Sequence, residues 1–195
     1  MIIIGITGTF GAGKGTIVDY LVNKKGFKHY PVLSFLEKEV IKRGLEVNID
    51  TLVETGNDLR SKHSPDFIVQ ELYQEAVRVG KNAVIESLRT IGEVNFLKSK
   101  PYSYIFAIDA DVLKRYERII LRSGPKDHIN FEEFTQKEKK QMFSSDPDKP
   151  NLSVCIEMAD YKFINNDDVN DLYQQIEKVF EKMKSPETKN GRQSV

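Results

Sequence analysis

The sequence predicts an α/β protein in which helices cover both faces of a five-stranded parallel sheet. Five short apolar runs alternate along the 195 residues with segments whose apolar residues recur every three or four positions. This alternation is typical of strands joined by crossover helices. The first run ends in a glycine-rich loop that leads directly into a helical segment. Such crossovers are right-handed, so we expect ligands at the carboxyl ends of the strands.

The first strand and the loop after it are predicted from residues 2–16. Isoleucines at positions 2, 3, 4 and 6 indicate a buried strand. Gly8, Gly11 and Gly13 allow backbone N–H groups to turn towards phosphate oxygens, and Lys14 adds a positive charge at the start of a helix. The alternative is an ordinary glycine-rich turn, but the flanking strand and helix favour a phosphate site. The predicted phosphate-binding loop consists of Gly8, Thr9, Phe10, Gly11, Ala12, Gly13, Lys14, Gly15 and Thr16.

The end of this loop departs from the commonest pattern. Gly15 stands where a Ser or Thr would ligate Mg²⁺ directly, and the hydroxyl follows one position later, at Thr16. We therefore expect Thr16 to hold the metal through water. The Gly-Lys-Gly-Thr ending resembles the adenylate kinase group of nucleoside monophosphate kinases in the P-loop NTPase superfamily. The resemblance implies that ATP and Mg²⁺ are the cofactors, with residues 8–16 binding ATP and Lys14 acting in phosphoryl transfer.

The next elements follow in order along the chain. Residues 28–33 predict a second short strand, and Ser34 is expected to cap a helix that ends near residue 44. Residues 50–80 predict two helices, with Pro65 at the first position of the second.

The second half of the chain alternates in the same way. The predicted strands are 82–86, 102–108 and 161–164, and the predicted helices are 91–98, 111–122 and 168–184. Residues 123–152 are polar and contain one predicted helix, from residue 130 to about 143, which makes them a candidate lid. Residues 185–195 have almost no apolar content and are predicted to form a disordered tail.

The length and composition predict one domain. With 39% hydrophobic residues, the chain can bury one substantial core, but it is short for two. We expect a single domain over residues 1–184, with a helical acceptor-binding insertion at about 34–80 and the lid at about 123–152.

Charge and cysteine content exclude several classes of protein. The 29 basic and 29 acidic residues balance, so neither a nucleic-acid polymer nor a membrane is the expected partner, and the expected partners are small nucleotides. A single cysteine, Cys155, excludes an intramolecular disulfide. No stretch is apolar and long enough to span a bilayer, and the N-terminus lacks the features of a signal peptide. We expect a cytoplasmic enzyme.

Glu86 and Arg89 follow the third predicted strand. Phosphoryl transfer requires positive charge and positioning, so arginines at strand ends are the informative residues. The spacing resembles adenylate kinases, in which an acid ends the equivalent strand and an arginine three residues later holds the acceptor phosphate. The resemblance implies that Arg89 binds the acceptor and that Glu86, beside the acceptor, orients hydrated Mg²⁺. The alternative is a strand-end acid paired with a surface arginine.

Arg115, Arg118 and Arg122 lie three and four residues apart, on one face of a predicted helix. Residues 117–122 resemble the segment that leads into the lid of monophosphate kinases. The resemblance implies that Arg118 and Arg122, more than Arg115, contact the transferring phosphates. Without it, a solvated basic face is the simpler interpretation.

Arg60 lies in the helical insertion and is a candidate for bidentate binding of an acceptor phosphate. Residues 56–60 and 155–161 together resemble a little-characterised branch of P-loop proteins related to dephospho-CoA kinase and adenylate kinase.

Some residues depart from the adenylate kinase pattern or carry weaker signals. Residues 34–40 lack the arginine of the first acceptor-binding helix, so AMP is not favoured, and the lid has no cysteines for zinc.

Asp109 and Asp111 are candidates for Mg²⁺, although strand-end and helix-capping aspartates are common. Cys155 is expected to be a buried apolar residue. Surface or capping roles are expected for His29, His63 and His128, and most of Lys126, Lys137, Lys139 and Lys140 are expected to be solvated.

Three functions follow from these observations. The first is transfer of the γ-phosphoryl group of ATP to a nucleoside or deoxynucleoside monophosphate. The second is transfer to a hydroxyl acceptor such as dephospho-CoA, which requires a general base. The third is a nucleotide-sensing module without kinase activity, which does not require a second phosphate site.

Overall fold

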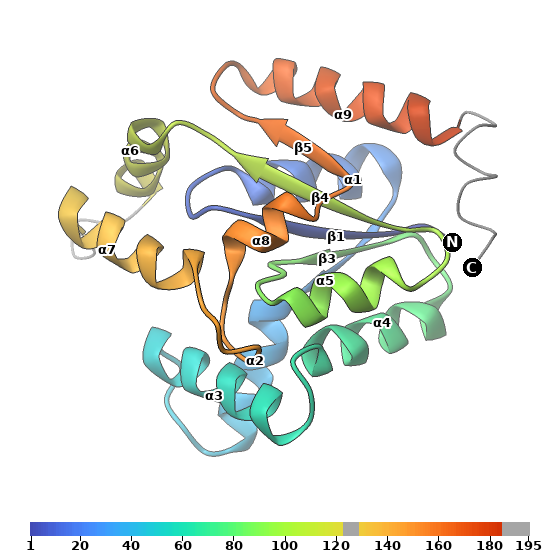
Figure 1. Cartoon of the computed structure of the whole chain (residues 1–195). Helices are drawn as coiled ribbons and strands as arrows, with labels where there is room; N and C mark the ends of the chain where they lie inside the picture. The colour runs from blue at the N-terminus through green and yellow to red at the C-terminus, as the bar shows by residue number, and fades with distance from the viewer. Residues whose placement is uncertain (123–128, 185–195) are drawn as a thin grey trace.

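The computed structural model describes residues 1–122 and 129–184. Its five strands form one sheet in the order β2-β3-β1-β4-β5, and every adjacent pair is parallel. Helices cover both faces, so the predicted three-layer α/β/α fold is confirmed (Figure 1). The strands are β1 Ile3–Gly8, β2 Lys28–Pro31, β3 Ala83–Glu86, β4 Ser103–Asp109 and β5 Tyr161–Ile164.

The helices lie close to their predicted ranges. They are α1 Lys14–Lys25, α2 Val32–Lys42, α3 Ile49–Lys62, α4 Phe67–Val79, α5 Ile91–Lys98, α6 Val112–Arg122, α7 Phe131–Met142, α8 Leu152–Glu157 and α9 Val169–Lys184. The short helix α8 was not predicted, because its six residues are too few to display a helical period. Asn151 caps it by accepting from the backbone N–H of Val154.

Two predicted helix starts are wrong. Helix α2 begins at Val32, directly after Pro31, so Ser34 lies inside the helix and does not cap it. Helix α4 begins at Phe67 after Asp66, so Pro65 precedes the helix instead of opening it. In both cases a favourable capping residue was present, but the chain enters the helix at a neighbouring position.

The core lies on both sides of the sheet because successive strand residues face opposite ways. Ile4 and Phe106 face α1 and α9, where they meet Ile17 and Ile176. On the other face, a second cluster joins the sheet to α2, α3, α4, α5 and α8, and its members include Ile3, Ile85, Ile105, Leu72, Leu97 and Cys155.

The sheet register brings the ends of four strands together. Glu86 of β3 lies beside Ile6 of β1 and Pro31 of β2, and Gly8 lies beside Ile108 of β4. The loop after β1 therefore emerges between the ends of β3 and β4. Helices α6 and α7 lie together at one end of the molecule, and α2 and α3 lie below the sheet in the view of Figure 1.

The predicted insertion comprises most of α2 together with α3 and α4. Helix α4 packs on β3 and α5, and α3 packs on α2 and α4. Of the predicted lid, residues 129–152 are described and contain α7. Lys126, His128 and the predicted tail 185–195 lie outside the described residues. Within residues 1–122 and 129–184, no helix is long and apolar enough to cross a membrane.

Candidate phosphate-binding site

The loop of residues 8–16 depends on glycine at two close approaches. Gly11 has φ +81°, and a Cβ there would collide with the carbonyl oxygen of Arg115. Gly13 has φ +103° and caps α1, and a Cβ there would collide with the side-chain amide of Asn165. Only glycine tolerates both conditions without strain. The first-turn N–H groups of α1 have no intrahelical acceptor, and the helix dipole adds positive potential at the same place.

Lys14 bends back over the loop. Its Nζ donates to the carbonyl oxygens of Gly8 and Thr9, at 3.0 and 2.9 Å. The pKa of Lys14 is lowered from 10.5 to about 8, mainly by burial and next by the positive charge of Arg89. Glu86 raises this pKa, whereas Arg122 and Arg115 lower it further. Positive charge therefore exceeds negative charge around the loop, as an anion site requires.

A pocket of about 20 Å³ marks the centre of the site. Its lining includes Gly8, Lys14, Ser87, Arg89 and Gln141. A larger hollow of about 620 Å³ lies between α6 and α7. The smaller pocket is the relevant one, because it joins the glycine-rich loop to the end of β3.

Glu86, at the end of β3, and Arg89, just after it, contact different side chains. The Glu86 carboxylate lies 2.9 Å from His29 Nε2, and the His29 side chain is 33% exposed, so this histidine contacts the strand-end acid at the surface. Ser87 has φ +78°, an unusual conformation for a residue with a side chain. The N–H groups of Ser87 and Leu88 both donate to the carbonyl of Ile6, which holds this turn against β1.

Arg89 is half-buried and lines the same pocket as Lys14. Its Nη1 donates to Gln141 Oε1 of α7 at 3.0 Å. Burial and the neighbouring charge of Arg60 lower the pKa of Arg89, and Glu93 raises it. Because Glu86 pairs with His29 instead of Arg89, the alternative of a strand-end acid paired with a surface arginine does not describe this site.

Arg60 is buried, with 4% of its surface exposed, and it is paired with Glu93. Its Nε and Nη2 both donate to Glu93 Oε1, at 3.1 and 2.9 Å. The predicted bidentate fork of Arg60 is therefore directed at a carboxylate of the protein. Sequence reasoning missed Glu93, which appears locally only as the capping partner of Thr90 in α5.

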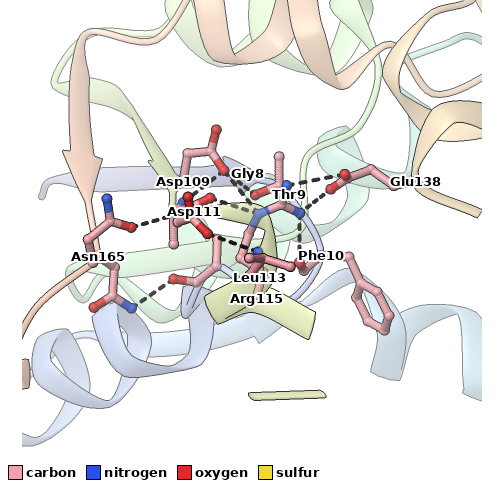
Figure 2. Close-up of polar contacts among 12 residues, drawn as sticks. Gly8, Thr9, Phe10, Asp109, Asp111, Leu113, Arg115, Glu138 and Asn165 are labelled. Carbon is pink, nitrogen blue, oxygen red and sulfur yellow. Dashed lines mark hydrogen bonds and ion pairs between the residues drawn. The ribbon is translucent and has the colours of Figure 1, made fainter. Parts of the chain in front are cut away.

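Arg115 connects α6 to both the loop and α7 (Figure 2). It is buried and donates to the carbonyl oxygens of Ala110 and Phe10, at 2.9 and 3.2 Å. Its two Nη atoms donate to the carboxylate of Glu138 on α7. Phe134, one turn before Glu138, packs its ring 6.1 Å from that of Phe10. Glu138 was not predicted as a site residue, because a glutamate on a polar helix carries no local signal of its partner.

The other two arginines of α6 lie differently. Arg118 is half-buried, and its Nη2 donates to the carbonyl oxygen of Asn165 at 2.7 Å. Its Nη1 is buried without a hydrogen-bond partner among the described residues. Asn165 in turn donates its amide to the carbonyl of Ala12, so it links Arg118 to the loop. Arg122 is exposed at the end of α6.

The two aspartates near the loop have structural partners. Asp109 Oδ1 accepts from the Thr9 hydroxyl at 2.5 Å and from the N–H of Ala110 at 2.8 Å (Figure 2). Asp111 accepts from the N–H of Leu113 at the start of α6. These contacts match the alternative of strand-end and helix-capping roles.

The donor set suits Mg²⁺ only in combination with ligand oxygens. Within the described residues, no group of three or more His, Cys, Asp or Glu side chains could hold a metal. Thr16 is half-buried and offers a hydroxyl, and Glu86 offers a carboxylate that is 21% exposed. Mg²⁺ commonly takes one or two protein oxygens together with phosphate and water, so the two residues fit such a metal.

The remaining predicted residues occupy structural positions. Cys155 is buried as predicted, and burial raises the pKa of its thiol to about 12. His63 stacks on Phe67, with ring centroids 4.1 Å apart. The side chains of Lys137, Lys139 and Lys140 are exposed on α7, as expected for solvated lysines.

Comparisons with known proteins agree with this fold. No protein-family model matches the chain. A UPF0200 protein of Methanococcus vannielii is 28% identical over 189 residues, which cover 94% of this chain and 97% of the relative. A UPF0200 protein of Methanocaldococcus jannaschii is 26% identical over 189 residues, which cover 94% of this chain and 91% of the relative.

Solved structures resemble the whole chain. TT1252 from Thermus thermophilus superposes with a TM-score of 0.59 at 19% identity, covering 94% of this chain and 98% of that one. The shikimate kinase of Bacteroides thetaiotaomicron superposes with a TM-score of 0.57 at 14% identity. The match covers 92% of this chain and 98% of that one. The shikimate kinase of Acinetobacter baumannii, in complex with shikimate, superposes with a TM-score of 0.55 at 16% identity. The match covers 94% of this chain and 95% of that one. The chain therefore has the P-loop kinase fold.

Proposed function

We propose that this protein transfers the γ-phosphoryl group of ATP to a small acceptor, and that the acceptor is a nucleoside or deoxynucleoside monophosphate. The observation that carries the proposal is the meeting of Lys14 and Arg89 in one pocket at the end of β1 and β3. Two cations that line one pocket suit two phosphate groups that must lie in line for transfer.

The donor side of the pocket fits a polyphosphate. The loop of residues 8–16 supplies backbone N–H groups, the α1 dipole and Lys14. The pocket of about 20 Å³ has room for about one water molecule. Binding therefore requires Lys14 Nζ to leave the carbonyl oxygens of Gly8 and Thr9, and Gln141 to move from Arg89.

The acceptor side favours a group that is already ionised. Arg89 lines the pocket as a cation, and a phosphate acceptor needs no general base at neutral pH. When bound, Mg-ATP would supply the phosphoryl group and a divalent cation. We assign the metal-facing oxygens to Thr16 and Glu86, and charge neutralisation during transfer to Arg118 and Arg122.

A hydroxyl acceptor is the second candidate. It is favoured by the Glu86–His29 contact at the strand edge, which provides a carboxylate beside a pocket lined by Lys14. Shikimate kinases and a sugar kinase from Janibacter are among the similar folds. A sensing module without transfer does not account for the second cation, Arg89, in the pocket.

The test is Mg-ATP consumption by the purified protein with ribo- and deoxyribonucleoside monophosphates, dephospho-CoA and shikimate. Lys14→Ala is the blank, and Lys178→Ala, an exposed lysine on α9, is the matched control. Stimulation by a monophosphate that disappears in Lys14→Ala supports the proposal. Stimulation by an unphosphorylated hydroxyl acceptor selects the second candidate, and nucleotide binding without any stimulation selects the sensing module.

A further inference from the structure

Glu93 is the most deeply buried carboxylate near the site, with 0% of its surface exposed. It accepts four hydrogen bonds. Arg60 Nε and Nη2 donate to Oε1, at 3.1 and 2.9 Å, and the backbone N–H groups of Arg89 and Thr90 donate to Oε2, at 2.6 and 3.2 Å. One carboxylate therefore connects α3 to the backbone of the pocket arginine.

Helix capping explains only part of this arrangement. Thr90 and Glu93 form a capping box at the start of α5, and a glutamine at position 93 would satisfy that motif equally well. The box requires neither a buried charge nor Arg60. Burying a carboxylate with an arginine is unfavourable unless both are fully hydrogen-bonded. The shortest of the four bonds, moreover, goes to Arg89 and not to the capping residue.

Two further hydrogen bonds hold Arg89, one at its backbone and one at its side chain. The carbonyl oxygen of Arg89 accepts from the N–H of Asn151 at 2.8 Å, just before α8. Its side chain reaches Gln141 of α7. Glu93 thus fixes the N–H side of a residue whose carbonyl side is fixed independently. The negative charge of Glu93 also offsets the repulsion between the two neighbouring arginines, Arg60 and Arg89.

We propose that Arg60 and Glu93 are a positioning pair that sets the orientation of Arg89 towards the acceptor phosphate. This inference rests on the proposed function. Arg60 acts through Glu93 and does not itself contact the acceptor. The helical insertion therefore reaches the pocket through a buried ion pair, and a shift of α3 is transmitted to the backbone of Arg89.

The kinetic test is Glu93→Gln in the full-length protein, with kcat and KM measured separately for Mg-ATP and for the monophosphate that gives the highest wild-type rate. A small misplacement of a phosphate-binding group lowers the rate of transfer strongly. We therefore expect kcat/KM for the acceptor to fall by about tenfold or more, while KM for Mg-ATP changes by less than about twofold. Unchanged acceptor kinetics, or equal losses for both substrates, would overturn the proposal.

A conservative series separates positioning from simple destabilisation. Arg60→Lys keeps the charge opposite Glu93 and loses the fork, whereas Arg60→Met loses both. Acceptor kcat/KM is expected to recover at least partly in Arg60→Lys relative to Arg60→Met. The matched control is Asp160→Asn, because Asp160 also joins an ion pair, with Lys98, to a backbone N–H, that of Ile105. Its acceptor kinetics are expected to stay at the wild-type level, and a loss equal to that of Glu93→Gln would count against the proposal.

A second measurement does not depend on activity. The amide of Arg89 is expected to resonate downfield and to exchange slowly in ¹⁵N-labelled wild type, because it donates a short bond to a carboxylate. In Glu93→Gln its resonance is expected to move upfield and its exchange to accelerate. An Arg89 amide that is unaffected would refute the positioning pair even if the enzyme were active. If wild type consumed no ATP with any acceptor, the proposed function would fail, while this measurement would still decide whether Glu93 holds Arg89.

Discussion

Lys14 carries the charge that a phosphate needs, but its surroundings weaken that charge above neutral pH. Its pKa of about 8 means that the free protein loses this proton in a range where an ordinary lysine keeps it. A bound phosphate favours the protonated form and raises the pKa again. Binding is therefore coupled to proton uptake.

The affinity for ATP is expected to fall as the pH rises. Between about pH 8 and about pH 10 the free protein is largely neutral at Lys14 and the complex is protonated, so the dissociation constant should increase by up to about tenfold per pH unit. Calorimetry in buffers of different ionisation enthalpy measures the proton uptake. Lys14→Met should remove it, and the same uptake in that variant would assign the titration to another group.

The Arg60–Glu93 pair is expected to matter for stability as well as for positioning. Arg60→Met leaves a buried carboxylate with half of its partners, which should lower the free energy of unfolding by about 3 kcal/mol. Arg43→Met is the control, because the Arg43–Asp58 pair is about one-third exposed and solvent screening should make its contribution much smaller. Urea denaturation compares the two, and equal losses would contradict the difference in burial.

At the scale of elements, α7 covers the phosphate-binding loop. It is held there by Glu138 on Arg115, by Phe134 on Phe10 and by Gln141 on Arg89. These contacts join α7, within the candidate lid, to α6, to the loop after β1 and to the turn after β3. With α7 in this position the pocket is too small for a triphosphate, so the proposed nucleotide binding requires at least the end of α7 near Gln141 to move.

Spin labels can detect that movement. Lys137→Cys on α7 and Lys178→Cys on α9 provide exposed sites, whereas the native Cys155 is buried and should not react. The distance distribution between the two labels is expected to change on addition of Mg-ATP, measured by double electron–electron resonance. A distribution that stays the same at saturating nucleotide would show that the pocket opens without α7.

Strands were easier to predict than the elements around the site. Strands β1, β3 and β4 follow from apolar runs, because a buried parallel strand leaves a continuous local signal. The edge strands β2 and β5 were also predicted, although each has only one buried residue. Helix α8 and the starts of α2 and α4 do not follow from local pattern, since packing on the sheet decides them.

At the scale of the whole molecule, the loop and the strand-end residues were predictable because their spacing is local. Lys14, Glu86 and Arg89 all lie at the expected edge of the sheet. The partners that define the site were not predictable: His29 meets Glu86 across 57 residues, and Glu93 meets Arg60 across 33. Pairs so distant in sequence are set by the fold, so no spacing or periodicity reveals them.

The described residues share cores on both faces of one sheet, and α4 of the predicted insertion packs directly on β3 and α5. We expect the insertion and the sheet to unfold together. Tyrosine fluorescence and far-ultraviolet circular dichroism should give coincident urea transitions. Two separable transitions would mean that the insertion is an independent unit and that residues 1–184 are not one domain.

In the proposed reaction, the pocket lined by Lys14 and Arg89 transfers a phosphoryl group to an acceptor phosphate. The most direct measurement is Mg-ATP consumption with the panel of acceptors, in wild type, Lys14→Ala, Arg89→Ala and Arg122→Ala. We expect one monophosphate to stimulate turnover strongly, and each variant to reduce kcat/KM for the acceptor by about a hundredfold or more while remaining folded. Stimulation that survived in Lys14→Ala or Arg89→Ala, or the absence of stimulation by any monophosphate, would contradict the claim.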